Sequence, residues 1–213
     1  MDRLLKEALL AYGPAFVGPA LWAFATFPEK LRWTGEVSAR VFSVLAGIYD
    51  VWTEVEGYGE PLEQAILDLR AAPERILDLA TGTGYAARRL KERFPGAEVV
   101  GVDVSAEMVA IAEQDSLSQG LEISYMVGEV AALPFSDGSF DLVVQQNAMP
   151  FPDEIMRVVR PAGRALIILS VGGPWASLAW PALAGRLEGA GAVHVRSRRV
   201  GFGFYGAARK GGA

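Results

Sequence analysis

Short apolar runs alternate with amphipathic segments along most of the chain, from about Glu60 onward. Runs such as RILDLA and FDLVVQQ are nearly continuous in apolar residues, which is typical of strands covered on both faces. Segments such as PLEQAILDLR and AARRLKERF carry apolar residues three or four positions apart, which is the spacing of one helix face. The pattern predicts strands at residues 75–80, 98–104, 122–127, 140–146 and 164–170, followed by a closing pair of strands within 193–209 that is joined near Gly201. It predicts helices at 61–70, 86–94, 106–114 and 174–192, and we expect the last helix to be kinked at Pro181.

Seven predicted strands, with helices expected between the first six, indicate an α/β fold built on a doubly wound, seven-stranded sheet. We expect mostly parallel strands, because a helical crossover returns the chain to the same edge of the sheet. The closing pair leaves no room for a helix, so the last strand should be antiparallel. Residues 1–44 precede the alternation and are too few for a core of their own. We therefore expect an N-terminal helical lid or extension at 1–44 and one domain at 45–213.

The composition narrows the function classes. The 213 residues are 51% hydrophobic and carry a net charge of −5, which gives no general attraction to a nucleic-acid backbone. The lack of cysteine excludes disulfides and thiolate metal sites, and a single histidine leaves little material for a metal centre. The apolar stretch 12–27 is too short, and too interrupted by Pro14 and Pro19, for a membrane span, although a weak interfacial contact stays open. With no secretory signal at the start, we expect a cytoplasmic protein.

A glycine-containing turn, Ala80 to Gly84, follows the first strand and opens the next helix. In a doubly wound sheet, ligands bind beyond the carboxyl ends of the strands, where the strand order reverses. Asp103 ends the next strand, where a carboxylate can accept hydrogen bonds from a ribose diol. Asp78 lies inside the first strand, and its charge disfavours a pyrophosphate but favours a ligand with ammonium and sulfonium groups, as in S-adenosylmethionine. A carboxylate that only caps its own loop is the alternative for Asp78.

Four stretches carry a family resemblance: ILDLATGTG, GVDVSAEMVAIAE, GEVAALPFSDGSFDLVV and EIMRVVRPAGRALIIL. They run in order from Ile76 to Leu169 and resemble the class I S-adenosylmethionine-dependent methyltransferases, in particular the ubiquinone and menaquinone C-methyltransferases. Residues 41–52 are also similar to the approach segment of those quinone enzymes. The resemblance implies a Rossmann-like methyltransferase fold, S-adenosylmethionine as methyl donor, S-adenosylhomocysteine as product and a small-molecule acceptor.

The same resemblance implies a role for each matching residue. The glycines of the turn line the methionine part, Asp103 binds the ribose hydroxyls, and the backbone near Gln145 meets the ammonium group. Glu129 stands where the family usually has an aspartate that accepts from the adenine amino group; an exposed loop acid is the alternative. The resemblance implies that Val104 and Met108 pack on the adenine. The predicted cofactor-binding residues are Asp78, Ala80, Gly82, Gly84, Asp103, Val104, Met108, Glu129, Val130 and Gln145.

Two departures from the family pattern concern the site. Ala80 replaces the first glycine of the family loop, which fits if this residue keeps a negative φ. The segment 151–160 is several residues shorter than the usual helix, which would widen or reshape the acceptor pocket. Methyl transfer needs in-line positioning of the acceptor, and a dedicated base is optional. Candidates for the acceptor wall are Trp22, Tyr49, Trp52, Asn147, Met149 and Trp175, and candidates for a catalytic role are Tyr49, Asp50 and Asn147; each has a competing role in the core.

Other polar residues near the C-terminus favour structural roles. His194 could act as a general base, but the start of its strand should lie at the sheet edge opposite the cofactor. Arg196, Arg198 and Arg199 indicate a solvated edge strand. The alternative places Arg198 at the mouth of the acceptor pocket, where it would bind an anionic group.

Methyl transfer to a small apolar or aromatic acceptor is the function that these features favour, because the predicted lid is apolar. An O- or N-methyltransferase of a natural-product scaffold is the alternative within the fold. A nicotinamide-dependent oxidoreductase is the alternative from another class, since GTGYAA also fits a dinucleotide-binding turn. A non-catalytic S-adenosylmethionine-binding protein stays open as well, if the short segment 151–160 closes the acceptor pocket.

Overall fold

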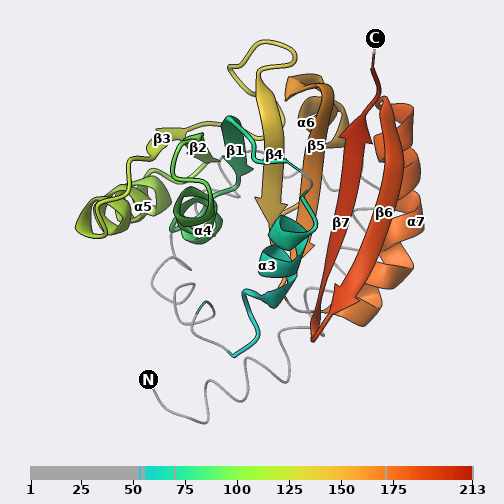
Figure 1. Cartoon of the computed structure of the whole chain (residues 1–213), viewed down its shortest axis with the longest axis horizontal. Helices are drawn as coiled ribbons and strands as arrows, with labels where there is room; N and C mark the ends of the chain where they lie inside the picture. Colours follow the sequence, from blue (N-terminus) through green and yellow to red (C-terminus); the bar gives the residue numbers. More distant parts are fainter. Residues whose placement is uncertain (1–52, 54–55, 70, 171, 213) are drawn as a thin grey trace.

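Seven strands form one sheet at the centre of the molecule (Figure 1). The computed structural model describes residues 53, 56–69, 71–170 and 172–212. The strand order is β3-β2-β1-β4-β5-β7-β6. Strands β1 to β5 pair in parallel, and β7 is antiparallel to both of its neighbours, which confirms the predicted fold class. The strands are β1 (Arg75–Leu79), β2 (Glu98–Asp103), β3 (Ser124–Val127), β4 (Phe140–Gln146), β5 (Val159–Leu169), β6 (Ala192–Val200) and β7 (Gly203–Lys210).

Helices cover both faces of the sheet, as a doubly wound fold requires (Figure 1). One apolar layer packs α3 and α4 on β1, β4 and β5, with Leu62 and Leu90 fully buried. The other packs α6 and α7 on the opposite face, with Ile155 and Leu187 fully buried. The described helices are α3 (Glu60–Leu67), α4 (Tyr85–Arg93), α5 (Ala106–Ser118), α6 (Pro152–Val158) and α7 (Gly173–Gly189).

The structure differs from the sequence prediction in several details. Residues 128–139 connect β3 to β4 through turns, without the helix that was expected there. Pro134 and Gly138 lie in this segment, and both residue types disfavour a helix. Strand β5 begins at Val159 rather than at Arg164, with a register shift against β4 near its start. Helix α3 ends at Leu67, before the predicted residue 70. Helix α7 continues through Pro181.

The C-terminal hairpin closes one side of the sheet. Its outer strand β6 is an edge strand, and Arg196, Arg198 and Arg199 are exposed on it, as predicted. His194 is also exposed, in a left-handed conformation with φ of 52°, near a register shift at the start of β6. Because β6 runs in the direction of β5, its start lies at the amino edge of the sheet, away from the ends of β1 and β4. No described helix is both long and apolar enough to cross a membrane.

Candidate functional site

The turn after β1 has the backbone shape of a ligand-binding loop. Gly82 and Gly84 have φ of 54° and 83°, a left-handed conformation that glycine adopts without steric cost. Ala80 has φ of 51°, so the condition under which alanine fits this position without strain, a negative φ, is not met. An L-residue in this conformation costs about 1–3 kcal/mol, because its Cβ approaches the backbone. The turn therefore carries backbone strain at Ala80.

Asp103 connects this turn to the end of β2. Its Oδ2 accepts a hydrogen bond of 2.8 Å from the Gly82 amide, and its Oδ1 accepts one of 3.0 Å from the Ser105 amide. Ser105 then caps α5, because its hydroxyl accepts from the Met108 amide at 3.2 Å. Burial raises the pKa of the Asp103 carboxyl, while these backbone donors lower it. The carboxylate is held at the carboxyl edge of the sheet, where a ribose diol binds in such folds.

Asp78 lies beneath the same turn and is 1% exposed. Its Oδ2 accepts a hydrogen bond of 2.6 Å from the Thr81 hydroxyl, so the carboxylate does cap its own loop. Burial raises the pKa of Asp78 to about 7, with a further increase from the charge of Asp103. A cation bound near Asp78 would favour its ionised form and lower this pKa again.

The loop after β3 supplies the third side of the candidate site. The Gly128 amide donates to the Asp103 carbonyl at 2.8 Å, which places Glu129 close to the end of β2. Glu129 is exposed, while Val104 and Val130 are partly buried. Met108 is 1% exposed and offers almost no free surface. Of the predicted adenine contacts, Val104 and Val130 are therefore the better placed to wall a flat ring.

A hydrogen-bonded cluster joins the ends of β4 and β5. Asn147 has φ of 54° and its Nδ2 donates to the Tyr58 hydroxyl at 2.9 Å and to the Ser170 Oγ at 3.1 Å. Its Oδ1 accepts from the Ser170 amide at 2.8 Å. Gln145 donates from Nε2 to the Met149 carbonyl at 2.7 Å, which fixes the loop that follows β4. Because both donors and the acceptor of Asn147 are engaged, its amide holds this loop in place.

Three buried polar atoms around the turn have no hydrogen-bond partner in the described structure: Asp78 Oδ1, Thr83 Oγ1 and Gln145 Oε1. Buried polar atoms are nearly always paired in folded proteins, so unpaired ones ask for a missing partner. Two of these atoms are acceptors and the third is a hydroxyl. A ligand that brings N–H or O–H donors, such as an ammonium group, would satisfy them. The residues present thus fit an amino-acid-bearing nucleoside.

The acceptor side is described only in part. Asn147 and Met149 follow β4, and Trp175 lies in the first turn of α7 with 43% of its surface exposed. All three therefore follow the carboxyl ends of strands β4 and β5. The remaining candidates, Trp22, Tyr49, Asp50 and Trp52, lie outside the described residues, as does the predicted boundary at 44/45.

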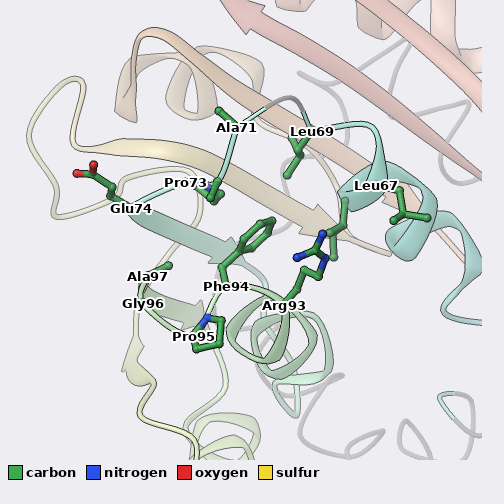
Figure 2. Close-up of a pocket in the computed structure, with 12 residues that line it drawn as sticks. Leu67, Leu69, Ala71, Pro73, Glu74, Arg93, Phe94, Pro95, Gly96 and Ala97 are labelled. Atoms are coloured by element: carbon green, nitrogen blue, oxygen red, sulfur yellow. The ribbon is translucent and has the colours of Figure 1, made fainter.

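A surface hollow of about 560 Å³ lies away from this site (Figure 2). It is lined by residues that precede strands, such as Glu74 before β1 and Ala97 before β2, and by Arg93 and Phe94 at the end of α4. These positions are at the amino edge of the sheet. The hollow is therefore separate from the turn that holds Asp78 and Asp103.

Comparison with known proteins adds to this geometry. A family model described as a methyltransferase domain matches residues 76–166. The demethylmenaquinone methyltransferase of Thermus thermophilus is 42% identical over 139 residues, which are 60% of this chain and 63% of that protein. Over residues 76–166 this chain is therefore similar in sequence to methyltransferase domains. The matched residues run from β1 into β5 and include all the predicted cofactor-binding residues.

Two further comparisons show the range of the similarity. The malonyl-[acyl-carrier protein] O-methyltransferase of Methylococcus capsulatus is 33% identical over 154 residues, 68% of this chain and 54% of that protein. A SAM-dependent methyltransferase structure from Methanosarcina mazei superposes with a TM-score of 0.57 at 20% identity, over 70% of this chain and 98% of that chain, and supports the fold. The chain spans about three fifths of the length of the curated relatives it matches.

Several residues of the site were missed from the sequence. Tyr58 precedes the first described helix and reaches Asn147, and Ser170 follows β5 and completes the cluster. Thr81 and Thr83 lie within the glycine turn, one bonded to Asp78 and one unpaired. The hydroxyl residues between the glycines were a signal in the sequence, whereas the pairing of Tyr58 with Asn147 depends on tertiary structure.

Proposed function

We propose that this chain catalyses methyl transfer from S-adenosylmethionine to a small apolar or aromatic acceptor. The observation that carries the proposal is the turn between β1 and α4, where Asp103 and the unpaired Asp78 and Gln145 oxygens surround a left-handed glycine loop. The family match over residues 76–166 supports the same conclusion and does not favour a nicotinamide oxidoreductase. The predicted cytoplasmic location stays a prediction.

In this proposal each side of the site has one task. Asp103 accepts from the ribose hydroxyls, Glu129 accepts from the adenine amino group, and Val104 and Val130 hold the ring. Asp78 and the backbone near Gln145 receive the ammonium group. S-adenosylmethionine, when bound, supplies a methyl group on a positively charged sulfur.

The chain's own contribution to the reaction is positioning. The turn and the loop after β4 face the same edge, so an acceptor seated near Asn147 and Met149 lies beside the methyl donor. An apolar wall excludes water and favours a reaction in which positive charge is neutralised. Proximity and alignment alone can supply several powers of ten in rate, so no dedicated base is required.

The relatives' names suggest two acceptor classes. The demethylmenaquinone methyltransferase supports an aromatic quinone precursor, and its 42% identity makes this our first choice. The malonyl-[acyl-carrier protein] O-methyltransferase supports a carboxylate oxygen as the second choice.

An acceptor assay with isotope-labelled S-adenosylmethionine separates them. We expect label on carbon when a short-chain demethylated naphthoquinol is offered, and none with a malonyl thioester. Label on the thioester carboxylate alone would reverse the order of the two choices. Transfer to neither, with intact S-adenosylhomocysteine binding, would identify a non-catalytic binding protein and overturn the proposed activity.

A further inference from the structure

The outward face of helix α7 carries no charge over its first three turns. Residues 173–185 contain no Asp, Glu, Lys or Arg, and Trp175 and Leu178 are 43% and 67% exposed. Pro181 is exposed on the same helix. A surface helix normally presents charged residues to water, as α4 does with Arg89 and its neighbours. This face of α7 is therefore an apolar surface without a cover among the described residues.

The hairpin between β6 and β7 extends this surface. Phe202 at its tip is 82% exposed. The Gly173 amide donates to the Phe202 carbonyl at 3.0 Å, so the tip lies against the start of α7. We refer to Trp175, Leu178, Pro181 and Phe202 as the apolar corner. It lies where β5 and β6 end, at the same edge of the sheet as the candidate site (Figure 1).

One of the three arginines of β6 lies on the same side of the sheet as the apolar corner. Arg196, Arg198 and Arg199 are exposed on β6, in a chain whose net charge is −5. Arg199 is opposite Phe204, which packs on Ala176 of α7, so Arg199 lies on the α7 side of the sheet. Arg198 is opposite Tyr205 on the other side. Of the three arginines of β6, Arg199 is therefore the one on the α7 side, at the carboxyl end of the edge strand.

We propose that the apolar corner docks on a lipid surface that carries anionic headgroups. Tryptophan and phenylalanine partition into the membrane interface, and an adjacent guanidinium pairs with lipid phosphate. Each basic residue near an anionic surface adds attraction that salt screens. Contact between two copies through this corner would bring the two Arg199 side chains near each other, which like-charge repulsion opposes. Docking would turn the edge that holds the candidate site towards lipid, where an apolar acceptor dissolves.

Co-sedimentation of the full chain with vesicles tests the proposal. We compare vesicles of phosphatidylcholine with vesicles of phosphatidylcholine and phosphatidylglycerol. The double variant W175S/F202S should lower the partition coefficient on both vesicle types at least tenfold. Arg199→Gln should lower it several-fold on the anionic vesicles only and reduce its dependence on salt.

Matched variants make the result specific. Leu117→Ser on α5 replaces an equally apolar side chain, 78% exposed, and should leave vesicle binding unchanged. Titration of each variant with S-adenosylhomocysteine shows whether the variant is folded and keeps its cofactor site. Loss of lipid docking can therefore be distinguished from failure of the methyltransferase proposal. Wild-type chain that binds neither vesicle, or W175S/F202S that binds as Leu117→Ser does, would overturn lipid docking. A dimer that W175S/F202S dissociates, without vesicle binding, would instead assign the corner to a second copy.

Discussion

At the scale of single residues, the backbone strain at Ala80 is the clearest departure from the family loop. We predict that Ala80→Gly raises the free energy of unfolding by about 0.5–1 kcal/mol, because glycine relieves the strain at φ of 51° but gains freedom in the unfolded chain. Chemical denaturation measures the change. Ala110→Gly in the middle of α5 is the control and should lower the free energy of unfolding by about 1 kcal/mol. Equal destabilisation by both substitutions would contradict a left-handed Ala80.

We expect Asp78 to make the binding of S-adenosylhomocysteine depend on pH. Its pKa of about 7 means that below neutrality the carboxyl is mostly protonated, and a cationic ligand must displace that proton. We predict that S-adenosylhomocysteine binds more tightly as pH rises from 6 to 8, by up to tenfold per unit below pH 7. Asp78→Asn should bind more weakly with a flat pH profile, whereas Glu129→Gln should keep the slope. Calorimetric titration at three pH values checks this, and a slope that survives in Asp78→Asn would disprove it.

At the scale of elements, Arg157 fixes the loop that connects β3 to β4, a segment that contains no helix. Its guanidinium donates to the carbonyls of Phe135 and Leu133 at 2.7 and 3.1 Å and pairs with Glu154 and Asp137. Loss of these bonds leaves loop carbonyls without donors. Arg157→Met should therefore lower the free energy of unfolding by about 1–2 kcal/mol.

Hydrogen exchange locates the effect of Arg157→Met. Amides within 131–138 should exchange several-fold faster, while those of β1 and β4 stay protected. Arg89→Met removes exposed ion pairs to Glu63 and Glu92 and is the control; it should cost less than about 1 kcal/mol. Unchanged exchange in the loop would refute the anchoring role of Arg157.

The elements also show how far the sequence carries the structure. Apolar runs such as FDLVVQQ identified the central strands of the sheet, because burial on both faces imposes a continuous apolar pattern. The start of β5 was wrong, since its first residues, VRPAG, contain proline and glycine and pair with β4 only through a register shift. The left-handed φ of Ala80 could not be predicted from alanine's local preference. Tertiary hydrogen bonds, such as the one from the Gly82 amide to Asp103, fix the shape of the turn instead.

At the scale of the whole molecule, the sheet collects residues from distant parts of the chain at one edge. The strand order brings Asp78, Asp103 and Gln145 to the same edge of the sheet. Their placement near the carboxyl ends of strands was predictable once the strands were known. The contact of Tyr58 with Asn147 was not, because it joins residues 89 positions apart through side chains alone. The acceptor side therefore needed the structure more than the cofactor side did.

The most direct test of the account is calorimetric titration with S-adenosylhomocysteine, with NADH as the comparison ligand. We predict micromolar binding of S-adenosylhomocysteine only, weakened at least tenfold, or about 1.4 kcal/mol, in Asp103→Ala. Glu113→Ala on α5 is the matched control and should bind as wild type does. Thermal unfolding of each variant confirms that it is folded. Failure of the folded wild-type chain to bind S-adenosylhomocysteine, or equal binding by Asp103→Ala, would contradict the central claim.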